Sequence, residues 1–282
     1  MKKKTGIVDV GGGMRGIYAA GVFDFCLDAG IRFDLGIGVS AGSANLASFA
    51  AGQSQRNQRF FAEYSQRKQY MGWENFIRKG SFLDLDYIYG TLSNSAGVDP
   101  LNYPAFMANP MEILMVATEA ESGNPKYFSK NDISQDNYDV LKASCAIPYV
   151  CKPQFIDMVP YYDGALGDTI PFEKAFELGC DKVVLVLTLP LDTVRTSKKD
   201  KFLAARIRKT YPMAAHRLEH RAGQYNVRIA QAKKYADQGK LLFVAPDNTC
   251  GVTTLKRKPN CMARLYAKGY SDGHRIVSFL TD

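Results

Sequence analysis

The sequence contains no long apolar run and no sign of a cleaved leader. No window of its 282 residues approaches the roughly 18 consecutive apolar residues that a membrane-spanning helix needs. The lysine-rich start, Met1–Thr5, is followed by a short strand-like run and glycines instead of the apolar core of a signal peptide. We therefore expect a cytoplasmic protein, with peripheral attachment to a membrane as an open alternative.

Paired cysteines and clustered metal ligands are also absent. The six cysteines stand singly, without a CxxC pair and without histidines at the spacing of a zinc site. This pattern predicts free thiols, no metal and no cofactor. The cysteines are Cys26, Cys145, Cys151, Cys180, Cys250 and Cys261.

The positive charge of the chain is confined to one segment. The formal net charge is +8, and residues 195–234 hold twelve lysines and arginines against only Asp200 and Glu219. A basic amphipathic segment can contact an anionic membrane surface, but it can equally be a solvated helix face. Because no known nucleic-acid-binding module surrounds these charges, we do not expect a nucleic-acid partner.

Short apolar runs alternate with amphipathic segments, and this pattern predicts an α/β protein with a mostly parallel sheet. The apolar runs are rich in β-branched residues and bounded by turn formers, as in buried strands. Strands are expected at 5–10, 35–39, 112–118, 183–188 and 241–245. Helices are expected at 17–27, 42–49, 56–70, 138–146, 172–178 and 202–237.

A glycine-rich loop, Gly11–Gly16, follows the first expected strand and opens a helix. Such a loop directs bare backbone amides outward, and the helix dipole makes this position favourable for an anion. The anion could be a phosphate or the oxyanion of an acyl-transfer intermediate, and the loop alone does not distinguish them.

The same loop also matches a dinucleotide-binding fingerprint through Gly11, Gly13 and Gly16. That fingerprint requires an acidic residue at the carboxyl end of the second strand, about 20 residues further on. Asp34 has this spacing, but it precedes the expected strand 35–39 and would lie at the opposite edge of the sheet. We therefore regard dinucleotide binding as the weaker alternative.

The second expected strand leads into a nucleophile elbow, Gly38-Val39-Ser40-Ala41-Gly42, which has the G-x-S-x-G form. The serine must occupy a tight turn with its hydroxyl exposed, so Gly38 and Gly42 are needed where larger side chains would collide with the adjacent strand and helix. Serine is also a common helix N-cap, which is the alternative interpretation of Ser40.

A nucleophilic serine requires a base, and the sequence offers few histidines. His216 and His220 lie in the basic segment, and His274 lies near the C-terminus, where the chain order would suit a Ser–Asp–His triad. None follows an expected strand.

Asp163 is the better candidate, because it follows a short apolar and aromatic run at an Asp-Gly turn; a surface turn is the alternative. An aspartate with the usual pKa near ~3.9 is a poor base, so this role requires burial beside Ser40.

These motifs together resemble the patatin-like phospholipases. The resemblance rests on the loop Gly11–Gly16, the elbow Gly38–Gly42, the stretch Ala143–Pro148 followed by Pro153, and Asp163-Gly164, in family order across residues 6–188. It implies a three-layer α/β/α fold and a dyad of Ser40 and Asp163 without histidine. It also implies an oxyanion hole, chiefly from Gly12 and Gly13, within the loop Gly11, Gly12, Gly13, Met14, Arg15 and Gly16.

One position departs from the pattern: many family members have a second glycine where this chain has Ala165. We expect residues 1–190 to form the catalytic core. Residues 191–282 are expected to be an extension packed on the same body and not an independent domain, and the family gives this extension no role.

The resemblance implies a serine hydrolase of lipid esters, of the phospholipase A, lysophospholipase or esterase type, that acts through an acyl-enzyme. An acyltransferase, or a nucleotide- or lipid-binding protein with an idle serine, is the alternative. An aromatic-rich stretch is expected to form an acyl pocket or lid, unless it is ordinary core. It comprises Phe60, Phe61, Tyr64, Tyr70, Met71, Trp73, Phe76, Phe82, Leu83, Tyr87 and Tyr89. The sequence does not determine the natural substrate or the oligomeric state.

Overall fold

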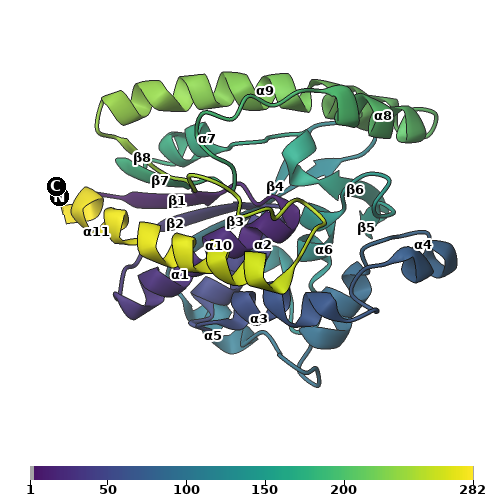
Figure 1. The fold of residues 1–282 in the computed structure, drawn as a ribbon, viewed down its shortest axis with the longest axis horizontal. Helices are drawn as coiled ribbons and strands as arrows, with labels where there is room; N and C mark the ends of the chain where they lie inside the picture. The colour runs from purple at the N-terminus through teal and green to yellow at the C-terminus, as the bar shows by residue number, and fades with distance from the viewer. Residues whose placement is uncertain (1–2, 282) are drawn as a thin grey trace.

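The centre of the fold is a mostly parallel β-sheet covered by helices on both faces, seen in a computed structural model that describes residues 3–281 (Figure 1). The strand order is β5-β6-β3-β2-β1-β7-β8, with β4 paired to β3. The strands are β1 Thr5–Asp9, β2 Leu35–Val39, β3 Glu112–Glu119, β4 Pro125–Ser129, β5 Gln154–Ile156, β6 Val159–Asp163, β7 Lys182–Val186 and β8 Leu241–Val244.

Helices α7 and α9 cover one face of the sheet, and α1, α2 and α10 cover the other (Figure 1). This is the predicted three-layer α/β/α arrangement. The helices are α1 Ile17–Asp28, α2 Ala41–Ala50, α3 Arg56–Ala62, α4 Trp73–Lys79, α5 Tyr103–Ala108, α6 Asp139–Cys145, α7 Phe172–Glu177, α8 Lys198–Ile207, α9 Pro212–Asp237, α10 Pro259–Asp272 and α11 His274–Thr281. No helix within residues 3–281 is both long and apolar enough to cross a membrane.

The central strands are apolar on both faces because each face supports its own core. Successive side chains of a strand point to opposite faces, so Ile7 belongs to the core beneath α1 and α2, whereas Val8 packs with α7 and α9. The same alternation occurs in β7, where Val184 and Leu185 belong to opposite cores.

All five predicted strands are confirmed to within two residues, and they pair in parallel as expected. The three short antiparallel strands β4, β5 and β6 were not predicted. The predicted helix 56–70 is wrong in length, because α3 ends at Ala62. The predicted stretch 202–237 is two helices, α8 and α9, and the break falls before Pro212, which occupies the first turn of α9.

Helix α10 packs closely along α1 at two glycines (Figure 1). A Cβ on Gly269 would lie 1.9 Å from the backbone oxygen of Tyr18, and a Cβ on Gly21 would lie 2.2 Å from that of Tyr266. Tyrosine hydroxyls add polar contacts between the helices, including Tyr18 to Asp272 at 2.6 Å. These contacts support the proposal that residues 191–282 belong to the same body as residues 1–190.

We predict that Gly269→Ala destabilises the protein, because the added methyl group overpacks the contact between α10 and α1. The free energy of unfolding, measured by urea denaturation, should fall by about 1–3 kcal/mol. Gly223→Ala in α9 is the matched control, since nothing lies within 4 Å of its added Cβ. Equal stability of Gly269→Ala and the unmodified protein would contradict the close helix contact.

Candidate active site

Ser40 occupies a strained turn between β2 and α2. Its φ of 56° and ψ of −129° are unusual for a residue with a side chain. Ser40 stands at the N-cap position of α2, but its side chain makes no capping hydrogen bond, so the N-cap interpretation does not account for it. Its backbone amide donates instead to Ser144 Oγ at 2.9 Å.

Close backbone packing surrounds the glycines that flank Ser40. A Cβ on Gly38 would lie 2.5 Å from Ser43 Cα, and a Cβ on Gly42 would lie 2.3 Å from the backbone oxygen of Asp9. The strand before the serine and the helix after it can therefore approach only because both positions lack side chains.

The register of β3 brings the ends of two strands together. Val116 of β3 pairs with Val39 of β2, and the next residue, Ala117, pairs with Asp163 of β6. Strand β4 pairs with the same two residues, Val116 and Ala117, along one edge of β3. Strands β2 and β6 must therefore both lie along the opposite edge of β3, end to end. The two strands run toward each other, so their carboxyl ends, carrying Ser40 and Asp163, meet.

Asp163 lies buried against the elbow. Its Oδ2 accepts a hydrogen bond from Ser40 Oγ at 2.6 Å, and its side chain also accepts one from the amide of Ala165 at 2.9 Å. The residue is only 2% exposed. Burial raises the pKa of Asp163, while these hydrogen bonds and the charges of Arg221 and Arg195 offset part of the rise. A role as base requires that Asp163 be buried beside Ser40, and the side chain lies in this position.

The glycine loop packs directly on the elbow, and two of its amides are engaged. A Cβ on Gly11 would lie 2.2 Å from the backbone oxygen of Val39. The amide of Gly11 donates to Asp9 Oδ1 at 2.9 Å, and that of Met14 donates to the backbone oxygen of Thr254 at 3.0 Å. These two amides are therefore occupied and do not face a substrate.

The amides of Gly12 and Gly13 have no hydrogen-bond acceptor among residues 3–281. Both residues have positive φ, 132° and 60°, which turns their backbone outward. A Cβ on Gly12 would lie 2.4 Å from Thr188 Oγ1, whose hydroxyl donates to the oxygen of Gly11. Of the predicted oxyanion loop, these are the amides that remain available to an anion. Gly16 is instead buried, and its oxygen accepts from Asn45.

Two supporting residues were given no role by the sequence analysis. Asp9 is fully buried and links the glycine loop to α2 through Gly11 and Asn45, whose Nδ2 donates to it at 2.9 Å. An acid within an apolar strand is the signal that would have found it. Ser144, which lies in the stretch singled out for its resemblance, accepts from the elbow and donates to Val116 at 2.6 Å.

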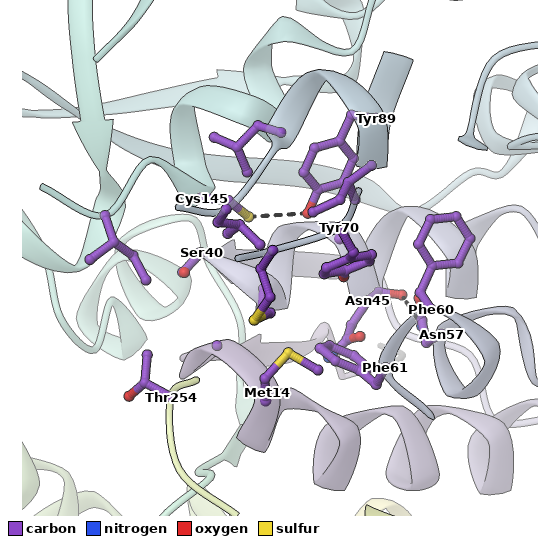
Figure 2. A pocket seen from close by; sticks show the side chains of 18 of the residues that line it. Met14, Ser40, Asn45, Asn57, Phe60, Phe61, Tyr70, Tyr89, Cys145 and Thr254 are labelled. Carbon is purple, nitrogen blue, oxygen red and sulfur yellow. Dashed lines mark hydrogen bonds between the residues drawn. The ribbon is translucent and has the colours of Figure 1, made fainter. Parts of the chain in front are cut away.

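An apolar cavity of about 60 Å³ opens beside Ser40 (Figure 2). Figure 2 shows Ser40 on one side of the cavity and the rings of Tyr70, Tyr89 and Phe61 on the other. The aromatic-rich stretch is thus divided: Trp73 is 70% exposed, whereas six of its residues line the cavity. These six are Phe60, Phe61, Tyr70, Met71, Leu83 and Tyr89.

The three histidines lie elsewhere in the fold. His274 packs on Phe25, with ring centroids 4.2 Å apart, and His216 and His220 contact each other on α9. None of them hydrogen-bonds to the Ser40–Asp163 pair within the described part of the chain. Asp34 accepts from the amide of Thr5 at the amino end of the sheet, so it is not placed for a ribose.

All six cysteines are free thiols, and four of them are buried. Across residues 3–281, no group of three or more His, Cys, Asp and Glu side chains is arranged to hold a metal ion.

Two family models match the chain. The model for patatin-like phospholipases matches residues 10–176, more than half of the 282 residues, and this region contains the glycine loop, the elbow and Asp163. A model described as a domain of unknown function (DUF6363) matches residues 211–281, within the C-terminal extension.

Similar proteins are found by sequence and by structure. An uncharacterized protein of Escherichia coli (strain K12), YjjU, is 29% identical over 189 residues, which cover 66% of this chain and 52% of that protein. The match thus spans about half the length of this relative. The crystal structure of VipD from Legionella pneumophila aligns with a TM-score of 0.51 at 12% identity, over 99% of this chain and 67% of VipD. This second likeness is one of fold alone.

We predict that Asp9 makes stability depend on pH. Burial raises its pKa to about 6, so the native state binds more protons than the unfolded state between pH 4 and 6, and stability falls as the pH rises through this range. In Asp9→Asn this loss is absent. The free energy of unfolding of Asp9→Asn minus that of the unmodified protein should therefore increase by about 3 kcal/mol as the pH rises from about 4 to 7. Both free energies of unfolding are measured by urea denaturation at several pH values. A difference between the two proteins that stays constant with pH would contradict the prediction.

Proposed function

Because the chain belongs to the patatin-like phospholipase family, we propose that it hydrolyses carboxylic esters of lipids, with Ser40 as the nucleophile and Asp163 as the base. The observation that carries this proposal is the buried hydrogen bond of 2.6 Å between Ser40 Oγ and Asp163 Oδ2. It lies beside two unengaged backbone amides and an apolar cavity, which supply the other parts of an acyl-transfer site.

In the proposed first step, Ser40 Oγ attacks the ester carbonyl carbon while Asp163 accepts the hydroxyl proton. The raised pKa of Asp163 favours this transfer, because the buried carboxylate gains in stability when it is protonated. The amides of Gly12 and Gly13 donate hydrogen bonds to the carbonyl oxygen as it becomes negative. The tetrahedral intermediate then collapses, and the leaving alcohol takes the proton from Asp163.

In the second step, water attacks the acyl-serine, and Asp163 again accepts a proton. Collapse of this intermediate returns the proton to Ser40 and releases a carboxylic acid. The acyl chain would occupy the apolar cavity, whose volume of about 60 Å³ is small. Ligand sites usually measure ~300–1,000 Å³, so a long chain requires the aromatic wall to move. An acyltransferase would differ only in using an alcohol in place of water.

Peripheral contact with an anionic membrane through residues 195–234 remains a proposal. Part of this basic charge is used within the protein, because Arg208 pairs with Glu219, Arg221 with Asp200, and Arg228 with Glu173. The exposed lysines of α8 take part in none of these ion pairs, and they would contact the lipid headgroups.

We predict that hydrolysis of a short-chain p-nitrophenyl ester depends on the dyad and not on histidine. Turnover should fall by about 10³-fold or more in Ser40→Ala and in Asp163→Asn, because each removes a group that acts in both steps. His274→Ala is the matched control and should retain turnover, since His274 packs on Phe25. Adding an alcohol acceptor and analysing the products separates hydrolysis from transfer. Loss of turnover in His274→Ala with Asp163→Asn still active would overturn the proposed base.

A second prediction concerns the proposed oxyanion loop. Gly12→Val should lower turnover by about 100- to 1,000-fold, because a side chain at φ 132° displaces the amide from its outward position. Gly52→Val is the matched control: Gly52 also has positive φ, 67°, but nothing lies within 4 Å of its Cβ position. The two variants are compared at equal amounts of folded protein, and equal turnover would exclude Gly12 from the site.

A further inference from the structure

A short segment of the C-terminal region, residues 252–258, lies against the glycine loop. It belongs to the connection between β8 and α10, which is drawn in yellow-green in Figure 1. Strand β8 pairs in parallel with β7, and β7 pairs in parallel with β1. The chain therefore leaves β8 at the same edge of the sheet at which the glycine loop leaves β1. We call residues 252–258 the strap, and it lies outside the match to patatin-like phospholipases, which covers residues 10–176.

Two hydrogen bonds join the strap to the glycine loop, and both end on Thr254. Its backbone oxygen accepts from the amide of Met14 at 3.0 Å, and its Oγ1 accepts from Arg15 Nη1 at 3.1 Å. A Cβ on Gly13 would lie 2.4 Å from the same backbone oxygen, so the strap packs directly on the loop. Figure 2 shows Thr254 and Met14 along one side of the cavity. Thr254 therefore holds the two residues that follow Gly13.

The strap is itself anchored at both ends. At its start, Val252 is 1% exposed and belongs to the core beneath α1 and α2. Near its end, Arg257 Nε donates to the backbone oxygen of Ser65 at 2.6 Å, in the turn that follows α3. Gln66 Nε2 donates in return to the backbone oxygen of Arg257 at 3.0 Å. The position of Thr254 is thus fixed by contacts on either side of it in the chain.

The two unengaged amides of the loop need such support from their neighbours. The amides of Gly12 and Gly13 make no hydrogen bond among residues 3–281 that would fix their direction. Consecutive glycines have wide conformational freedom, so other contacts must hold the backbone on either side of them. Before them, the amide of Gly11 is held by Asp9, and after them, the amide of Met14 is held by the strap. Donors that are fixed in advance are the ones that stabilise an oxyanion most.

We propose that the strap positions the amides of Gly12 and Gly13 for the oxyanion, with Thr254 as the positioning residue. The inference rests on the proposed function and adds the C-terminal region to the same site. The strap lies within residues 211–281, which match the domain of unknown function, so this region gains a role in this chain. Because Thr254 holds the loop, its loss should lower the rate of acyl transfer more than it lowers substrate binding.

The first experiment measures turnover of a short-chain p-nitrophenyl ester by Thr254→Val. Valine keeps the size of threonine, which also lines the cavity, but it removes the acceptor for Arg15. We expect kcat to fall about 10-fold with little change in KM, because the oxyanion forms only in the transition state. Thr254→Ser keeps the hydroxyl and should retain most of the turnover. Thr249→Val is the matched control, since the side chain of Thr249 makes no hydrogen bond within residues 3–281.

The second experiment tests the anchor of the strap and uses a transition-state analogue. Arg257→Gln shortens the side chain that reaches Ser65, and Lys256→Gln, at an exposed position of the strap, is its matched control. Butylboronic acid forms a tetrahedral adduct with a nucleophilic serine and places an oxygen in the oxyanion site. Its inhibition constant should rise in Thr254→Val and Arg257→Gln in proportion to the fall in kcat/KM. A loss of folded protein alone would lower the apparent kcat without changing the inhibition constant.

Hydrogen exchange at the amide of Met14 tests the strap without turnover. This amide should exchange about 10-fold faster in Arg257→Gln, because its bond to Thr254 opens more often, and at the original rate in Lys256→Gln. Unchanged exchange in Arg257→Gln would show that the strap does not hold the loop.

Faster exchange with unchanged kcat and an unchanged inhibition constant would overturn the positioning role. Absence of ester turnover in the unmodified protein would instead contradict the proposed function, and exchange would still decide whether the strap holds the loop.

Discussion

The carboxyl ends of β2 and β6 meet at one edge of β3, and the rest of the site depends on this meeting. It sets Ser40 Oγ 2.6 Å from Asp163 Oδ2, in a place where the aspartate is 2% exposed. A shift of one residue in the register of either strand would turn its side chains to the other face of the sheet and separate the pair. The two flanking glycines and the hydroxyl of Ser144 maintain the turn on which the serine lies.

The sequence predicted the parts of the fold whose signals are local. Apolar runs located the parallel strands, and the glycine pattern located the elbow, because a turn with no room for side chains leaves a mark in the sequence. The short antiparallel strands were missed. Strand β6 is short and contains a proline among its apolar and aromatic residues, so its sequence alone is a weak strand signal. Its pairing with β3 involves a partner that is distant in the chain.

In the candidate site too, the sequence predicted local motifs but not the contacts between distant segments. Ser40, Asp163 and the glycine loop could be named from motifs, whereas the sequence could not tell which loop amides are already occupied. Gly11 and Met14 are engaged by Asp9 and by Thr254, a residue far along the chain. Likewise, the basic segment was visible as a run of charge. Only the fold shows which of these charges are paired within the protein, as Arg221 is with Asp200, and which are exposed to solvent.

The most direct test of the Ser–Asp pair is the rate at which a fluorophosphonate labels the protein, followed by mass spectrometry across pH. We predict a single adduct on Ser40. We also predict a rate that rises with pH through a group whose pKa lies above that of an ordinary aspartate, because Asp163 must be ionised to accept the proton and burial raises its pKa. This dependence should vanish in Asp163→Asn. Labelling at another residue, or an unchanged profile in Asp163→Asn, would contradict the account.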